Sequence, residues 1–171
     1  MPLAPIGQEA SAGLPAKPLR AQFYRIVAQH LQDQILSQEG SELYGGRYNQ
    51  KGAFGALYCG ETPAVCSAEI RKATAGRTLN PLVLASVRIE LQRVLDLTDH
   101  AILQRLGLRP EHLVAPNWAE TQELGRLARE AGFEALLVPS AATTGKNLVI
   151  FPDHLDPGSS VHLLGVEPAK L

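Results

Sequence analysis

The run from Leu82 to Leu91 constrains the fold of this chain more than any other segment. Apolar and polar side chains alternate along it, which is typical of a strand with one buried face and one face in water. The apolar face consists of Val83, Ala85, Val87 and Ile89, and the polar face of Ser86, Arg88 and Glu90. Such a strand predicts a sheet that covers one core rather than a bundle of helices.

The rest of the chain alternates between further strand patterns and helix patterns. Strand-like runs cover residues 22–27, 56–59, 94–97, 133–138, 147–151 and 161–166. Helix signals begin at Thr62, Thr98 and Asn117 and end at Gly76, Gly107 and Gly132, whereas residues 28–38 fit a helix or a loop. We therefore expect an α+β fold, a single domain of mixed or antiparallel sheets with flanking helices.

The length of 171 residues is that of one ordinary domain. Residues 1–18 are rich in Pro, Gly and Ala and show no periodic apolar pattern, so we expect a flexible leader there. The domain itself is expected to span residues 19–171.

The composition excludes several classes of protein. The chain is 45% hydrophobic and 19% charged, which is typical of a globular protein rather than a disordered one. It has neither a run of about 20 apolar residues nor a signal peptide at its start, so we expect a cytoplasmic protein with no membrane contact. The 16 basic and 17 acidic residues nearly cancel, which argues against direct binding of nucleic acid.

The cysteines and histidines do not predict a metal site. Cys59 and Cys66 lack the C-x-x-C spacing of a redox or zinc motif, so we interpret them as small buried thiols. The histidines follow no H-x-x-x-H or H-x-E pattern; they are His30, His100, His112, His154 and His162. We expect no metal and no resident cofactor.

Glu69 is the first candidate for chemistry. In the helix expected from Thr62, it falls within the apolar arc that also holds Val65, Cys66 and Ile70. A carboxylate on such a face is costly unless it is hydrogen-bonded, paired with a cation or used in chemistry. A structural ion pair and a functional carboxylate both fit this pattern.

Two loops carry the other candidates. Arg47 stands in the turn GGRYN, where a small backbone and a planar guanidinium can approach a phosphate or carboxylate, or lie exposed to water. Tyr48 and Tyr58 fit either stacking platforms or core aromatics. Ser140 ends an apolar strand without a G-x-S-x-G elbow, and both it and Asn147 fit ligand contacts or loop-capping hydrogen bonds.

In their order and surroundings, these residues resemble the RES-domain family of bacterial toxins, which is named after an arginine, a glutamate and a serine. The matching positions are Arg47 in GGRYN, Glu69 in ALYCGETPAVCSAEI and Ser140 in LLVPSAATTGKNLVIFP. The segments YRIV, NWAETQELG and PDH extend the resemblance. The departures are Tyr48, where the family often has tryptophan, Phe151, where asparagine is common, and the longer leader.

The resemblance implies a fold similar to that of ADP-ribosyltransferase toxins. It implies a toxin enzyme that cleaves NAD, its substrate, at the nicotinamide–ribose bond by hydrolysis or phosphorolysis, which depletes NAD and arrests growth. It also implies an Xre-type antitoxin partner that blocks the site, and a homodimer within the toxin–antitoxin complex. Transfer of ADP-ribose to one cellular protein is the alternative within enzymes, and a non-catalytic module that binds a nucleotide or a partner is the alternative outside them.

On this resemblance, Glu69 stabilises the positive charge that develops on the ribose, and Arg47 binds the pyrophosphate with help from Arg25. Ser140 positions Glu69 or the ribose rather than attacking it. The remaining substrate-binding candidates are Tyr48, Tyr58 and Asn147.

Overall fold

The long strand β3 (Leu82–Asp96) is the element around which the sheet forms. The computed structural model describes residues 13–77 and 81–171. Along β3 the alternation expected from the sequence is confirmed, because Val83, Ala85, Val87 and Ile89 are buried. The run expected at residues 94–97 continues the sheet as the end of this strand, up to Asp96.

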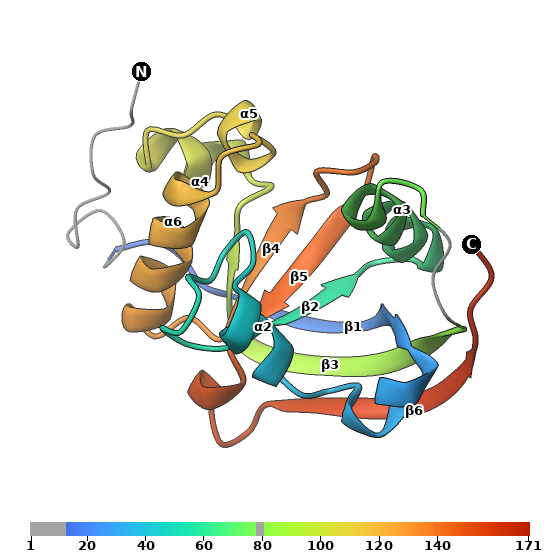
Figure 1. The fold of residues 1–171 in the computed structure, drawn as a ribbon. Helices are drawn as coiled ribbons and strands as arrows, with labels where there is room; N and C mark the ends of the chain where they lie inside the picture. Colours follow the sequence, from blue (N-terminus) through green and yellow to red (C-terminus); the bar gives the residue numbers. More distant parts are fainter. Residues whose placement is uncertain (1–12, 78–80) are drawn as a thin grey trace.

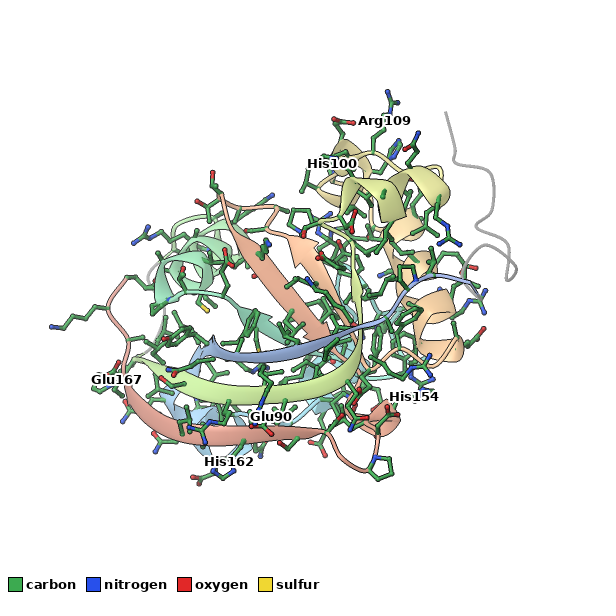
Figure 2. The ribbon with its side chains drawn as sticks, turned by 180° about the vertical axis from the view of Figure 1, so that it is seen from behind. Glu90, His100, Arg109, His154, His162 and Glu167 are labelled. Carbon is green, nitrogen blue, oxygen red and sulfur yellow. The ribbon has the colours of Figure 1, made fainter. Side chains whose placement is uncertain are left out.

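Strands β1 to β5 form a closed ring, in which each strand pairs with two neighbours, and β6 pairs with β3 outside this ring. The order is β1-β2-β5-β4-β3-β6, and β1 also pairs with β3. The bounds are β1 Lys17–Ala28, β2 Leu57–Gly60, β4 Ala135–Pro139, β5 Lys146–Ile150 and β6 Ser160–Pro168. Only β3 and β4 pair in parallel among the described strands, so the expected mixed sheet is confirmed. Figure 2 shows β1, β3 and β6 side by side on the face away from the helices.

Helices cover the sheet in two groups. Figure 1 shows α3 on one side of β4 and β5 and the group α4, α5 and α6 on the other. The α-helices are α2 Glu39–Tyr44, α3 Pro63–Thr74, α4 His100–Arg105, α5 Pro110–Leu113 and α6 Ala119–Glu130. Two 3-10 helices, η1 Gln29–Gln34 and η2 Pro152–His154, complete the described elements.

Helix α3 begins as its sequence predicts. The side chain of Thr62 accepts a hydrogen bond of 3.2 Å from the amide of Val65, and Pro63 occupies the first turn. At the other end, Ala75 and Gly76 have positive φ values of 53° and 74°, which stop the helix. Both ends of the helix expected from Thr62 to Gly76 are therefore confirmed.

Several boundaries differ from the sequence expectation. Strand β1 begins at Lys17 rather than at residue 22, because Lys17 pairs with Val94 of β3. It thus includes residues 17 and 18 of the expected leader, and Leu14, also part of that leader, is buried in the core; residues 1–12 lie outside the described residues. Helices α2 and α5 were not expected, since each is too short to show helical periodicity.

The core has two parts. One cluster lies between the sheet and helices α4 and α6, and includes Leu97, Leu113 and Phe133. The other lies inside the ring of strands and includes Phe23, Val87 and Leu137. Within residues 13–77 and 81–171, no helix is long and apolar enough to cross a membrane.

Candidate active site

A cavity of about 640 Å³ opens between α3, strands β1 and β2 and two loops. The loops are residues 45–47, after α2, and residues 114–118, before α6. This volume lies within the range of about 300–1,000 Å³ that is typical of small-molecule sites. The cavity therefore has room for a sizeable ligand.

Glu69 faces this cavity from α3, and two neutral donors hold its carboxylate. The Ser140 hydroxyl donates a hydrogen bond of 2.5 Å to Glu69 Oε1, and Asn147 Nδ2 donates one of 2.8 Å to the same oxygen. No described residue donates a hydrogen bond to Oε2 of Glu69. The two donors thus fix the carboxylate and leave one oxygen for a ligand.

The orientation of Ser140 is set by its own loop. Its hydroxyl oxygen accepts hydrogen bonds from the amides of Ala142 (3.1 Å) and Thr143 (3.3 Å). These bonds occupy the oxygen lone pairs, so the hydroxyl proton points to Glu69. Ser140 is 8% exposed and is not part of the cavity wall.

Arg47 lies on the wall formed by the two loops. Its Nη1 donates to the carbonyl oxygens of Ala115 (2.5 Å) and Leu113 (3.5 Å), which ties residues 45–47 to the loop before α6. The guanidinium also lies over the ring of Trp118, 5.7 Å from the ring centre. Nε and Nη2 donate to no described residue, so their three N–H groups can bind a ligand.

The Tyr58 hydroxyl holds the turn at residues 45–49 through two hydrogen bonds. It donates to Asn49 Oδ1 (2.6 Å) and accepts from the amide of Tyr48 (3.0 Å). A methyl group at Gly46 would lie 2.5 Å from this hydroxyl, so only glycine fits there. Burial raises the pKa of Tyr58, so the phenol stays protonated at neutral pH. Tyr58 lines the cavity as well.

Tyr48 lies elsewhere than the sequence analysis expects. Its side chain is 1% exposed, packs in the core beside α6 and does not line the cavity. Of the two interpretations that its sequence context allows, Tyr48 is the core aromatic, and its side chain does not reach the cavity as a substrate-binding residue would. The sequence of a short loop does not show whether a tyrosine side chain points into the core or toward a ligand. Here the side chain lies in the core, where burial of its aromatic ring lowers the free energy of the fold.

Arg25 reaches the cavity from β1 as a half-buried cation. Its Nε donates to the carbonyl of Ile35 (2.9 Å) and its Nη1 to the carbonyl of Tyr58 (2.8 Å). Burial lowers the pKa of its guanidinium, which nevertheless stays charged at neutral pH. Arg25 and Arg47 both line the cavity, together with Asn147.

Lys72 and Trp118 also belong to the cavity wall, although the sequence did not single them out as candidates. Lys72 follows Glu69 by one helical turn, and its Nζ donates to the carbonyl of Ala141 (2.7 Å). The i, i+3 spacing from Glu69 was the available signal for Lys72. Among the described residues, the cavity wall carries three cations, Arg25, Arg47 and Lys72, and one carboxylate, so it suits an anionic ligand.

Both cysteines are free thiols in buried positions, as predicted. Burial raises the pKa of Cys59 to about 12 and that of Cys66 to about 11. Both therefore remain protonated at neutral pH, which makes them poor nucleophiles although they border the cavity.

No group of three or more His, Cys, Asp or Glu side chains within residues 13–77 and 81–171 has the arrangement of a metal site. Figure 2 shows His100, His154 and His162 in separate parts of the molecule. The side chains that converge at the cavity are instead a carboxylate, hydrogen-bond donors and cations.

Comparison with known proteins decides the family of the chain. The model of the RES domain matches residues 22–168. The chain belongs to the RES-domain family. In this RES domain, the three residues that carry the family resemblance meet at the same site, with Glu69 and Ser140 in contact and Arg47 on the cavity wall.

Relatives of this RES domain include enzymes named for an NAD reaction. The NAD(+) phosphorylase MbcT of Mycobacterium tuberculosis, like that of Mycobacterium bovis, is 28% identical over 142 residues, which cover 79% of this chain and 75% of the relative. A probable NAD(+) phosphorylase of Mycobacterium tuberculosis is 32% identical over 111 residues, 62% of this chain and 53% of the relative.

The fold of the RES domain matches a solved structure. The crystal structure of the Mycobacterium tuberculosis MbcT–MbcA toxin–antitoxin complex contains a chain that aligns with a TM-score of 0.82 at 24% identity. The alignment covers 94% of this chain and 90% of the matched chain. This likeness confirms the single α+β domain.

Proposed function

We propose that this protein is the toxin of a toxin–antitoxin pair and cleaves NAD at the nicotinamide–ribose bond, with inorganic phosphate as acceptor. The observation that carries the proposal is the carboxylate of Glu69, held by Ser140 and Asn147 at the wall of a cationic cavity. The names of the related NAD(+) phosphorylases support the choice of substrate and acceptor.

Glu69 provides the catalytic stabilisation in this account. As the bond between nicotinamide nitrogen and ribose carbon breaks, its electron pair leaves with nicotinamide and positive charge develops on the ribose. A carboxylate that is already fixed in place stabilises this charge more than it stabilises the ground state. Nicotinamide leaves as a neutral molecule, so the reaction needs no general acid at the leaving group.

The cations of the cavity bind the negative parts of the reactants. Arg47 and Arg25 are assigned to the pyrophosphate of NAD, Arg47 through the N–H groups of Nε and Nη2. Lys72, one turn from Glu69, is assigned to the acceptor phosphate, whose oxygen then bonds to the ribose carbon that nicotinamide leaves. Asn147 and Tyr58 complete the substrate site through contacts with Glu69 and the Arg47 turn.

The partner and the cellular location follow from the same proposal. An antitoxin protein, of the Xre type that the family resemblance implies, covers the cavity and keeps the enzyme inactive. The large apolar side chains Leu43, Tyr44 and Trp118 are exposed near the cavity loops, which supports a protein partner on this face. Since NAD and phosphate are cytoplasmic metabolites, the cytoplasm is the compartment in which such an enzyme acts.

A proton NMR time course of the antitoxin-free protein with NAD tests the proposal. We expect free nicotinamide and ADP-ribose 1-phosphate in phosphate buffer, and no release in phosphate-free buffer. Release in both buffers with ADP-ribose as product means hydrolysis and contradicts phosphate as the acceptor. Absence of release in both contradicts the proposal.

Further measurements distinguish the two rival functions. A transferase that modifies one protein moves label from adenylate-labelled NAD to a protein band in cell extract while it consumes little free NAD. A non-catalytic module binds NAD in a saturable way, releases no nicotinamide and causes no growth defect on expression.

A further inference from the structure

Trp118 has an unusual position for the single tryptophan of the chain. Its side chain is 43% exposed and lines the cavity at the N-terminus of α6. Tryptophan is highly buried on average, because its large ring gains much free energy when it leaves water. An indole left half-exposed on a cavity wall is therefore a candidate contact for a flat ligand group.

The backbone around Trp118 is fixed without a ligand. Asn117 Oδ1 accepts a hydrogen bond from the amide of Ala119 (2.8 Å), which holds the turn into α6. The Thr121 hydroxyl lies 2.6 Å from the carbonyl oxygen of Arg47 and 3.2 Å from that of Trp118. These contacts join the backbone of the Arg47 turn to that of the Trp118 turn.

The cavity has two chemically different ends. Glu69, Ser140 and Asn147 form one cluster through their hydrogen bonds, and it lies where α3, the loop after β4 and the start of β5 meet. Trp118 belongs to the other wall, at the start of α6, and Figure 1 shows α3 and α6 on opposite sides of β4 and β5. Arg47 contacts Trp118 through its guanidinium, 5.7 Å from the ring centre.

NAD has the same order of groups along its length. Its nicotinamide ribose is followed by the pyrophosphate, then by the second ribose and adenine. With Glu69 at the nicotinamide ribose and Arg47 at the pyrophosphate, as the proposed function assigns them, the adenine lies on the side of Arg47 away from Glu69. Trp118 is the aromatic side chain of the described cavity wall at that end.

We propose that Trp118 is the stacking platform for the adenine base of the dinucleotide, an inference that rests on the proposed function. Every base has a π face, and stacking on an indole needs no hydrogen bonds to read it. Arg47 lies over the ring, 5.7 Å from its centre, and because Trp118 is 43% exposed on the cavity wall, part of its surface remains open to a base. Trp118 thus confers preference for a dinucleotide over a mononucleotide.

Substrate truncation tests this role. Nicotinamide mononucleotide carries the reacting bond and lacks the adenylate half of NAD. We expect Trp118→Ala to raise the KM for NAD by about 10- to 100-fold with little change in kcat, and to leave the KM for the mononucleotide unchanged. Trp118→Phe retains a ring and is expected to keep most of the affinity. Tyr44→Ala, at an exposed aromatic side chain outside the cavity wall, is the matched control.

Equal KM increases for NAD and the mononucleotide would overturn the adenine assignment, because they would place Trp118 at the shared half or give it a purely structural role. Unchanged KM values for both substrates would overturn it as well. Only a loss confined to the adenylate half supports the proposal.

Tryptophan fluorescence gives a second readout that does not depend on turnover. Because Trp118 is the single tryptophan, its emission reports only this position. We expect AMP and ADP-ribose to quench it in a saturable way and nicotinamide mononucleotide to leave it unchanged. Quenching by the mononucleotide alone, or by none of the three, would overturn the proposal. Saturable quenching by AMP in a protein that releases no nicotinamide would support the adenine site and contradict the proposed catalysis.

Discussion

The hydroxyl of Ser140 donates a 2.5 Å hydrogen bond to Glu69 Oε1. The two residues come from different parts of the chain, the loop after β4 and the middle of α3, and meet only because the sheet brings these elements together. The amides of Ala142 and Thr143 fix the hydroxyl, so the serine acts on the carboxylate and not on a substrate. Ser140 is thus a positioning residue in this account.

Ser140→Ala is expected to lower kcat for nicotinamide release by about 10- to 100-fold, since one hydrogen bond to a charged group contributes about 1.5–3 kcal/mol. The KM for NAD should change little, because Ser140 does not line the cavity. Steady-state kinetics of the wild type and Ser140→Ala measure this change. Ser67→Ala, which also lies away from the cavity wall, is the control. A covalent ADP-ribosyl adduct on Ser140, detected by mass spectrometry, would instead make it a nucleophile.

Lys72→Gln is expected to raise the KM for phosphate about tenfold while the KM for NAD stays constant. The physical reason is the loss of one charge-assisted hydrogen bond, about 1.5 kcal/mol. Arg71→Gln removes the same charge from the neighbouring position, which does not line the cavity, and should leave both constants unchanged. A similar rise in the KM for NAD in Lys72→Gln would show that this lysine binds the dinucleotide instead.

Gly125 controls how closely α6 approaches the Arg47 turn. A methyl group at this position would overlap the carbonyl oxygen of Tyr48, so the helix or the turn must move. We expect Gly125→Ala to lower the free energy of unfolding by about 2–3 kcal/mol and the Tm by about 4–12 °C. Thermal unfolding measures this. Gly40→Ala in α2, where a methyl group meets no atom within 4 Å, should instead be neutral or slightly stabilising. A wild-type Tm for Gly125→Ala would contradict the close packing.

Glu134 is a buried carboxylate with a structural task. Oε1 accepts hydrogen bonds from the amides of Gln92 and Arg93, and Oε2 from that of Asp156. Burial alone would raise the pKa of Glu134, but the Ser159 side chain and the backbone amides together outweigh it, and the pKa lies below its ordinary value. The charged form is therefore the one that stabilises the fold.

This direction of the pKa fixes the pH dependence. The stabilisation by Glu134 is complete above its ordinary pKa of 4.5 and is lost as the pH falls through the lower pKa of the folded state. Urea unfolding of Glu134→Gln should show a loss of about 1–3 kcal/mol at pH 7 that shrinks below pH 4.5. A loss that is the same at all pH values would contradict a role of the charge.

The sequence predicts those parts of the fold that depend on local periodicity. Alternation in β3 and the cap at Thr62 are confirmed, and the wheel of α3 places Glu69 on the side where its hydrogen-bond donors lie. Local periodicity does not predict which strands pair, because the pairing between β1 and β3 joins residues far apart in the chain.

The same limit applies to the site. Trp118 belongs to the cavity wall because Arg47 holds the loop before α6 through Ala115, a contact that no local pattern encodes. The sequence allows the same two interpretations for Tyr48 and Tyr58, yet Tyr48 lies in the core and Tyr58 at the cavity. Side-chain chemistry predicts the candidates, and tertiary packing selects among them.

The catalytic assignment of Glu69 is the central claim, and Glu69→Gln tests it most directly, because the substitution keeps the shape and removes the charge. Nicotinamide release from NAD in phosphate buffer should be followed by proton NMR for the wild type, for Glu69→Gln and for the control Glu167→Gln, which lies on the exposed strand β6 (Figure 2). We expect release by Glu69→Gln to be at least about 100-fold slower than by the wild type and the control, at an unchanged Tm. Wild-type release by a folded Glu69→Gln would contradict this account.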